Sequence, residues 1–322
     1  MGVDLSVIIP AYNEEENVAI LCKELTEVLR PLNREYEIIF VDDCSTDTTY
    51  RRLSDLHAQD AHVKIIKFRK NFGQSAAMKA GFDHAEGNLV ITLDADRQND
   101  PKDIPHMLDK IEAENYDVVC GWRYNRRDPF MKKISSRFAN RFRTCLTGET
   151  IHDSGCTLRV YRREAVRDIE LYGELHRYIP ALLLWKGYRI GEAKTNHRLR
   201  VSGKSKYTMK RFAKGFLDLL VITFWQKYSV RPMHIFGGFG LIIGGIGFLL
   251  SVYLGMSRIL FGTPLADRPL FLVALVLFVV GIQFVALGII ADILLRIYYG
   301  QNGRKSYLVE KECPVETIFR EK

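Results

Sequence analysis

Two long stretches without a charged side chain constrain the fold of this chain more than any other feature. Residues 232–257 and 269–291 contain no Asp, Glu, Lys or Arg. Each exceeds the roughly 20 apolar residues that an α-helix needs to cross a hydrocarbon core about 30 Å thick. We therefore predict an anchor at 232–299 with two transmembrane spans, at about 233–257 and 269–295. The alternative is a pair of buried core helices, but such helices seldom stay uncharged for so long.

Basic residues flank these spans unevenly. Lys and Arg are dense before the first span and recur after the second, whereas the loop between the spans offers only Arg258 and Arg268. Because loops rich in Lys and Arg stay on the cytoplasmic side, we predict an integral membrane protein with both termini in the cytoplasm. The N-terminal region, 1–205, and the tail, 300–322, then both face the cytoplasm.

The residues around the first span predict two further features. Residues 206–231 mix basic side chains with Phe, Leu, Trp and Tyr at helical spacing, which is typical of amphipathic helices lying in the membrane interface. Within the first span, Gly240 and Gly244 form a GxxxG pattern that lets another helix approach closely. Packing between the chain's own two spans explains this pattern, and a homo-oligomer is the alternative.

In the first 205 residues, apolar strand-like runs alternate with amphipathic helical stretches. This alternation predicts βαβ units and an α/β domain with a mostly parallel sheet, covered by helices on both faces. Ligands of such sheets bind beyond the carboxyl ends of the strands, so the polar residues that follow each strand are the candidate site. The predicted strands are 5–11, 36–43, 63–68, 88–96 and 116–122, and the predicted helices are 15–30, 47–59, 74–85 and 102–114.

The overall charge indicates the kind of partner. The chain carries a formal net charge of +8 and has a pI near 9.1, which suits an anionic partner such as a phosphate-bearing substrate, a lipid surface or nucleic acid. The basic residues gather at the membrane flanks, so we expect the lipid bilayer as partner and no nucleic acid. The six cysteines have no paired spacing and are interpreted as reduced thiols.

Two carboxylates and an amide follow the fourth predicted strand. Asp94, Asp96 and Gln98 lie within five residues of one another, and oxygen ligands of this kind suit Mg²⁺ or Mn²⁺, whose coordination is commonly completed by substrate phosphates. Such a cation would hold a nucleoside diphosphate and offset the charge that builds on it as a leaving group. The alternative is a pair of solvated turn residues.

Polar residues also follow the first two strands. Asp42 and Asp43 end the second strand, where carboxylates can accept hydrogen bonds from a base or ribose; the alternative is helix capping, for which Ser45 or Asp47 would also serve. Pro10, Tyr12 and Glu14 lie at the end of the first strand, where a ring and a carboxylate can hold a nucleoside.

Four motifs occur in an order that resembles a known family. SVIIPAYNEEENV, VDDCSTDTT, KNFGQSAAMKAG and DADRQNDP together resemble the family 2 glycosyltransferases, which have a GT-A fold. The stretches GWRYNRRD, HDSGCTLRVYRR, ELHRYIPALLLWKGYRIGE and NHRLRVSGKSKY, with the two apolar segments, resemble the polyprenyl-phosphate glycosyltransferases, including dolichol-phosphate mannosyltransferase and undecaprenyl-phosphate glucosyl- and formamido-arabinosyl-transferases. The resemblance covers essentially the whole chain.

The resemblance implies roles for individual residues. Pro10, Tyr12, Glu14 and Asp43 would border the nucleotide, and the metal ligands would be Asp94, Asp96 and Gln98. Arg97 stands where many relatives have Leu. Arg123 and Arg137 match basic positions that face the acceptor phosphate, a task that suits the fork of a guanidinium; the alternative is a surface or lipid-headgroup contact. Three more basic residues would bind the donor diphosphate or the acceptor phosphate: Arg200, Lys204 and Lys206.

Asp153 falls near the catalytic acid/base of the family. A phosphate monoester has a second pKa near 6 and is its own nucleophile at pH 7. We therefore expect Asp153 to orient the sugar or the acceptor more than it removes a proton. His152, beside it, is interpreted as structural.

The predicted function is inverting transfer of a sugar from a nucleotide-sugar to a polyisoprenyl phosphate, with Mg²⁺ or Mn²⁺ as cofactor. A UDP-sugar is the preferred donor and GDP-mannose stays open. Two alternatives remain: a processive polysaccharide synthase, although the chain lacks that class's QxxRW motif, and a non-catalytic membrane scaffold or flippase partner.

Overall fold

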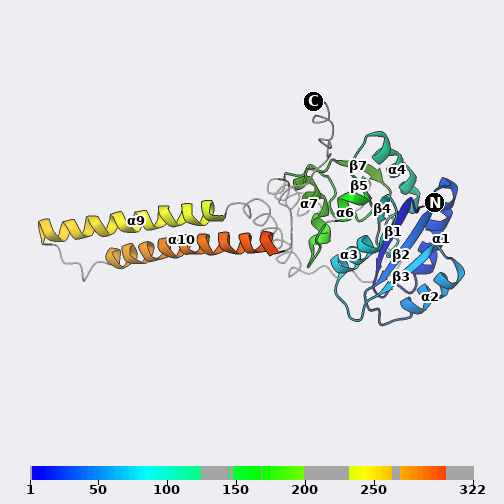
Figure 1. Cartoon of the computed structure of the whole chain (residues 1–322), viewed down its shortest axis with the longest axis horizontal. Coiled ribbons are helices and arrows are strands. Elements are labelled where there is room, and N and C mark those ends of the chain that lie inside the picture. The colour runs from blue at the N-terminus through cyan, green and yellow to red at the C-terminus, as the bar shows by residue number, and fades with distance from the viewer. Residues whose placement is uncertain are drawn as a thin grey trace, which may run out of the picture. The chain divides into compact units, whose positions relative to one another are not determined.

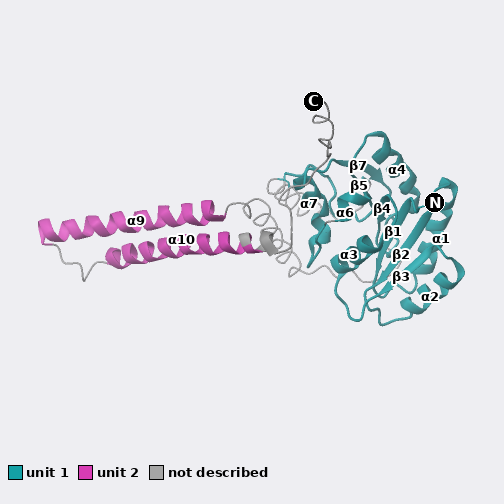
Figure 2. Cartoon of the chain, viewed as in Figure 1, with its two compact units in different colours: residues 1–219 teal, residues 220–322 magenta. Residues whose placement is uncertain are grey.

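The computed structural model describes residues 2–124, 144, 148–167, 169–198, 232–262 and 269–301. The chain divides into two compact units, residues 1–219 and 220–322 (Figure 2). The predicted interfacial segment, 206–231, lies outside the described residues, as does the predicted tail apart from its first two residues.

The first unit is built on a seven-stranded sheet. Its strand order is β3-β2-β1-β4-β6-β5-β7. Only β6 runs against its neighbours β4 and β5, and the other neighbouring strands pair in parallel. The prediction of a mostly parallel α/β sheet is therefore confirmed. The strands are β1 (Leu5–Ala11), β2 (Tyr36–Asp42), β3 (Val63–Lys67), β4 (Leu89–Thr92), β5 (Val118–Arg123), β6 (Arg159–Arg162) and β7 (Ile190–Thr195).

Helices cover both faces of this sheet (Figure 1). On one face, Val7 and Ile9 of β1 share a core with Leu21 of α1 and Met107 of α4, all fully buried. On the other face lies α3, where Gly81 allows contact with Ile8, because a Cβ at Gly81 would meet the Ile8 side chain at 2.3 Å. The helices of this unit are α1 (Val18–Leu29), α2 (Thr49–Gln59), α3 (Gln74–His84), α4 (Ile104–Ala113), α6 (Arg163–Arg167) and α7 (Ile179–Trp185), with 3₁₀ turns η1 (Arg30–Leu32), η2 (Pro101–Asp103) and η3 (Leu175–Tyr178).

The main departure from the predicted boundaries lies at the fourth strand. The apolar run suggested a strand over 88–96, but β4 ends at Thr92. Leu93 and Ala95 are still buried, so the apolar pattern continues after the strand hydrogen bonding has ended. Asp94 and Asp96 consequently lie in the turn beyond the strand.

The second unit contains a helical hairpin. The helices α9 (Pro232–Phe261) and α10 (Pro269–Gln301) have 30 and 33 residues, or about 45 Å or more at ~1.5 Å per residue, enough to cross a bilayer. In their most apolar windows, only 17% and 11% of the residues are buried. Core helices would be mostly buried, so the helices have the character of membrane spans.

Glycines allow the two helices of the hairpin to touch. A Cβ at Gly281 of α10 would lie 2.3 Å from the Gly244 Cα of α9, and one at Gly240 would lie 2.7 Å from the Gly281 carbonyl oxygen. The GxxxG pattern therefore serves packing within the chain. The homo-oligomer stays a prediction.

Candidate active site

The carboxyl ends of three neighbouring strands bring the predicted nucleotide and metal residues to one edge of the sheet. In the order β2-β1-β4, Asp42 ends β2, Pro10 and Ala11 end β1, and Asp94 follows β4. Ala11 is directly opposite Asp42, and Asp43 N donates to the Ala11 carbonyl oxygen at 2.9 Å. Parallel pairing thus gathers side chains that are up to 84 residues apart in the chain.

The loops after β1 and β2 are joined by hydrogen bonds. Asn13, at φ +56°, accepts from Thr46 N at 2.8 Å and donates its own N–H to Ser45 Oγ at 3.0 Å. Glu14 N donates to Thr49 Oγ1, and its carboxylate accepts from Asn17 Nδ2 at 2.7 Å. Neighbouring Tyr12 is 42% exposed, so its ring is available to a ligand.

Asp43 shapes the loop before α3. Its two carboxylate oxygens accept hydrogen bonds from Phe72 N at 2.7 Å and Gly73 N at 2.9 Å. The neighbouring Asp42 is fully buried and accepts from Ser45 N at 3.2 Å. Both carboxylates therefore organise the rim of the candidate site, and their predicted contact with the nucleotide stays a prediction.

The turn after β4 holds two carboxylates close enough to repel each other. Burial, followed by the charge of Asp96, raises the pKa of Asp94 to about 6. Gln74 Nε2 donates to Asp94 Oδ1 at 2.7 Å, and Gln98 N donates to Asp96 Oδ1 at 3.1 Å. A divalent cation would suit this donor set, because it would offset the repulsion and prefers oxygen ligands. Within the described residues, no group of three or more His, Cys, Asp or Glu side chains is placed to hold a metal ion.

Arg123 and Asp153 form a bidentate ion pair that the sequence did not indicate. Arg123, at the end of β5, donates from Nε to Asp153 Oδ2 at 2.6 Å and from Nη2 to Oδ1 at 2.9 Å. The side chains are only 11% and 13% exposed. Burial favours a lower pKa for Arg123, but the hydrogen bonds to Asp153 outweigh it and hold that pKa above its usual value. Arg123, predicted to bind the acceptor, and Asp153, predicted to be catalytic, are therefore held together by this ion pair.

Arg159 is a buried cation that sequence reasoning missed. It begins β6, is 2% exposed, and donates from Nη2 to the Ser154 carbonyl oxygen at 2.6 Å and from Nη1 to the His176 carbonyl oxygen at 3.2 Å. It also lies near enough to Asp94 to oppose the rise in that group's pKa. In the sequence, the sign of this buried cation is a charged residue inside the apolar run TLRVY.

The sequence also singled out His152 and four further phosphate-binding residues. His152 stacks on Trp122 with ring centroids 4.4 Å apart, and its Nδ1 is 2.7 Å from Glu192 Oε2, consistent with its structural interpretation. Four predicted phosphate-binding residues lie outside the described part of the chain: Arg137, Arg200, Lys204 and Lys206.

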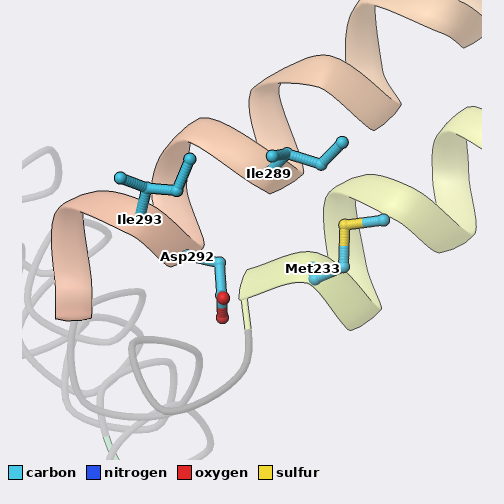
Figure 3. A pocket seen from close by; sticks show the side chains of 4 residues that line it. All are labelled: Met233, Ile289, Asp292 and Ile293. Atoms are coloured by element: carbon cyan, nitrogen blue, oxygen red, sulfur yellow. The ribbon is translucent and has the colours of Figure 1, made fainter.

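The helical hairpin has a hollow of its own. It is lined by Met233 of α9 and by Ile289, Asp292 and Ile293 of α10 (Figure 3). Three of these four side chains are apolar, so the hollow lacks the polar groups that a nucleotide needs.

Comparison with known proteins agrees with this geometry. The family model described as "Glycosyl transferase family 2" matches residues 6–170, from β1 through α6. The chain belongs to glycosyl transferase family 2. It is therefore a glycosyltransferase by family, as the four motifs predicted.

Relatives of this glycosyltransferase match along nearly its whole length. The dodecaprenyl-phosphate galacturonate synthase of Rhizobium johnstonii is 38% identical over 314 residues, covering 96% of this chain and 93% of the relative. The undecaprenyl-phosphate 4-deoxy-4-formamido-L-arabinose transferase of Proteus mirabilis is 37% identical over 314 residues, covering 97% and 94%. The similarity therefore includes the two apolar helices.

Solved structures share the fold. Glucosyl-3-phosphoglycerate synthase from Mycobacterium tuberculosis, in complex with Mn²⁺, UDP and glucosyl-3-phosphoglycerate, matches with a TM-score of 0.51 and 15% identity over 69% of this chain and 80% of that one. S. aureus TarS 1–349 in complex with UDP-GlcNAc matches with a TM-score of 0.50 and 18% identity over 94% and 93%. The predicted GT-A fold is confirmed.

Proposed function

We propose that this glycosyltransferase moves a sugar from a nucleotide-sugar to a polyisoprenyl phosphate, with inversion at the anomeric carbon. The supporting observation is the full-length similarity to two relatives whose names share a polyprenyl-phosphate acceptor. An acceptor of this kind is held in a bilayer, and this chain has two helices suited to a bilayer.

In this proposal the sheet edge binds the donor. Asp94 and Asp96 hold a divalent cation, with Gln98 as a further ligand, and the ring of Tyr12 contacts the nucleoside beside Pro10. Asp42 and Asp43 keep the rim in shape. The cation, Mg²⁺ or Mn²⁺, supplies positive charge to the leaving nucleoside diphosphate. The M. tuberculosis complex with Mn²⁺ and UDP supports this pairing and a UDP-sugar donor.

Arg123 is proposed to bind the acceptor phosphate, with Asp153 holding it in place. Both Asp153 oxygens accept from Arg123, so the carboxylate fixes the plane of the guanidinium. A correctly aimed fork can grip two phosphate oxygens. The phosphate oxygen then attacks the anomeric carbon in line with the departing diphosphate, and no base is required because the phosphate is largely ionised at pH 7.

The membrane would organise the two substrates. We propose that residues 206–231 lie in the interface, that Arg137, Arg200, Lys204 and Lys206 contact phosphate groups, and that the catalytic domain and both termini are cytoplasmic. This orientation follows from the basic residues flanking the spans.

Sugar transfer tests the proposal directly. Purified full-length protein would be mixed with a panel of UDP- and GDP-sugars and with undecaprenyl or dodecaprenyl phosphate, in Mg²⁺, Mn²⁺ or EDTA, and the lipid product read by mass spectrometry. We expect one lipid-phosphate-sugar product that requires metal and is lost in Asp96→Asn. Asp83→Asn, on an exposed carboxylate of α3 paired with Lys79, is the matched control.

Two outcomes would contradict the proposed function. A ladder of polymeric products would favour the processive synthase. Folded, Mn²⁺-binding protein that transfers no sugar from any donor would favour the non-catalytic scaffold.

A further inference from the structure

The loop that carries two of the predicted metal ligands, Asp96 and Gln98, is held from two sides. This loop, residues 96–100, is here called the metal loop. Arg198 N donates to the Gln98 carbonyl oxygen at 2.9 Å, and Asn99 forms an antiparallel bridge with His197. The chain leaving β7 therefore runs along the metal loop. Arg198 is the last described residue before 199–231, where the predicted basic residues Arg200, Lys204 and Lys206 lie.

A single carboxylate on α1 joins the two sides. Glu24 Oε1 accepts from Arg97 Nη2 at 2.7 Å, and Glu24 Oε2 accepts from Arg198 Nη1 at 2.7 Å. Arg198 Nη2 in turn donates to Asp100 Oδ1 at 2.7 Å. Two guanidinium groups and two carboxylates therefore alternate in the order Arg97, Glu24, Arg198 and Asp100. Their side chains are between 16% and 32% exposed. Burial favours a higher pKa for Glu24, but the hydrogen bonds from the two guanidinium groups outweigh it and lower that pKa.

The shape of the metal loop depends on contacts of this kind. Arg97 has φ +58°, a left-handed conformation that is unfavourable for a residue with a long side chain. Such a conformation persists only when surrounding contacts hold it. The hydrogen bond to Glu24 holds the Arg97 side chain, and Arg97 lies between the predicted ligands Asp96 and Gln98. A change at Glu24 would therefore act on the position of both ligands.

We propose that Glu24 is a positioning residue for the divalent cation. By bridging Arg97 and Arg198 it fixes the metal loop against α1 and against the chain leaving β7, and so sets the affinity for the metal. This inference rests on the proposed function, because that proposal makes Asp94, Asp96 and Gln98 the metal ligands. A purely structural role would change the stability of the fold and leave the metal affinity unchanged.

The chain offers a matched control. Arg34 and Glu112 form a bidentate pair at 2.7 and 2.9 Å, joining the loop before β2 to α4. Their side chains are 35% and 44% exposed, and neither belongs to the predicted site. Arg34→Ala removes a comparable ion pair without touching the metal loop.

The experiment measures Mn²⁺ binding to the full-length protein in the presence of UDP, by electron paramagnetic resonance of free Mn²⁺, together with the unfolding temperature. We expect Glu24→Ala to weaken Mn²⁺ binding by about 10-fold or more, as for other groups that hold metal ligands in place. Glu24→Gln keeps the shape of the side chain and one acceptor oxygen, so we expect a smaller loss of Mn²⁺ affinity. Arg34→Ala should change the Mn²⁺ dissociation constant by less than about 2-fold, as expected for loss of an exposed ion pair.

Three results would decide against the inference. Wild-type Mn²⁺ affinity in both Glu24 variants would overturn it while leaving the proposed function intact. An equal loss of Mn²⁺ affinity in Arg34→Ala would show that the effect comes from a general loss of stability. If Glu24→Ala does not fold, Glu24→Gln decides by the same criterion. Absence of Mn²⁺ binding in the wild type would overturn the proposed metal role and this inference with it.

Discussion

Arg123 and Asp153 are the residues whose relationship changes most once the chain is folded. The sequence placed Arg123 at the acceptor phosphate and predicted that Asp153 orients the sugar or the acceptor more than it removes a proton. The structure joins them by two hydrogen bonds at 2.6 and 2.9 Å. Gly155 leaves room for the pair, because a Cβ there would lie 3.0 Å from Arg123 Nη2.

This pairing predicts how an Asp153 variant behaves. Asp153→Asn removes the charge that holds Arg123, and we expect the poorer placement of the guanidinium to lower kcat/KM by roughly 30-fold, or about 2 kcal/mol of transition-state stabilisation. We expect the loss to fall mainly on KM for the lipid phosphate and to persist from pH 7 to pH 9. Steady-state kinetics across that range measure both.

One outcome would indicate that Asp153 takes part in acid/base chemistry. Full recovery of Asp153→Asn at pH 9 would mean that the carboxylate acts as a base. Glu114→Gln, which alters the exposed Lys110–Glu114 pair, is the control for loss of a carboxylate elsewhere.

The sequence located some site residues and missed others for a physical reason. Asp94 and Asp96 follow an apolar strand, so local pattern was enough to find them. Gln74 and Glu24 act through partners at least 20 positions away, and no local pattern reports such contacts.

At the scale of elements, a buried carboxylate of β2 connects the amino ends of four neighbouring strands, opposite the candidate site. Glu37 of β2 accepts from Ser6 Oγ of β1 and, at 2.8 Å, from Glu86 N just before β4. Lys64 of β3 lies 2.7 Å from its other oxygen. Burial favours a higher pKa for Glu37, but the hydrogen bonds from Lys64, Ser6 and Glu86 outweigh it and lower that pKa.

This lowered pKa predicts a pH-dependent stability. The stabilisation is complete above the pKa of Glu37 in the unfolded chain and is lost as the pH falls through the lower pKa of the folded state. We expect Glu37→Gln to reduce the free energy of unfolding by about 2 kcal/mol at pH 7 and by progressively less below pH 4.5. Glu35→Gln, on the exposed neighbour, should change little at either pH. Unfolding temperatures from pH 7 to pH 3 measure the difference, and a gap that widens in acid would contradict it.

The helical hairpin gives a second prediction at this scale. Gly281→Val would force the helices apart, because even a Cβ lies 2.3 Å from the Gly244 Cα. Overpacking of this kind costs about 1–3 kcal/mol, so we expect a lower unfolding temperature in detergent. Gly245→Val, where nothing lies within 4 Å, should be tolerated. A larger loss from Gly245→Val would indicate that its face contacts another copy of the chain.

For the whole molecule, the distribution of basic residues predicts orientation in the membrane. The positive-inside rule places the C-terminus on the cytoplasmic side and residues 263–268 on the other. A green fluorescent protein fused after Lys322 should fluoresce in bacterial cells, and alkaline phosphatase fused there should be inactive. Alkaline phosphatase inserted at residues 263–268 should be active. The reverse pattern would contradict the proposed orientation.

The sequence by itself determined the α/β class, the two apolar helices, the family and the carboxylates that follow β4. Each of these depends on local composition or on motifs read in order along the chain. Only the tertiary structure decided that Asp153 binds Arg123, that β6 runs antiparallel between β4 and β5, and that Glu24 connects the metal loop to Arg198. These contacts join residues between 30 and 174 positions apart, and such pairings arise only when the sheet and its helices have packed together.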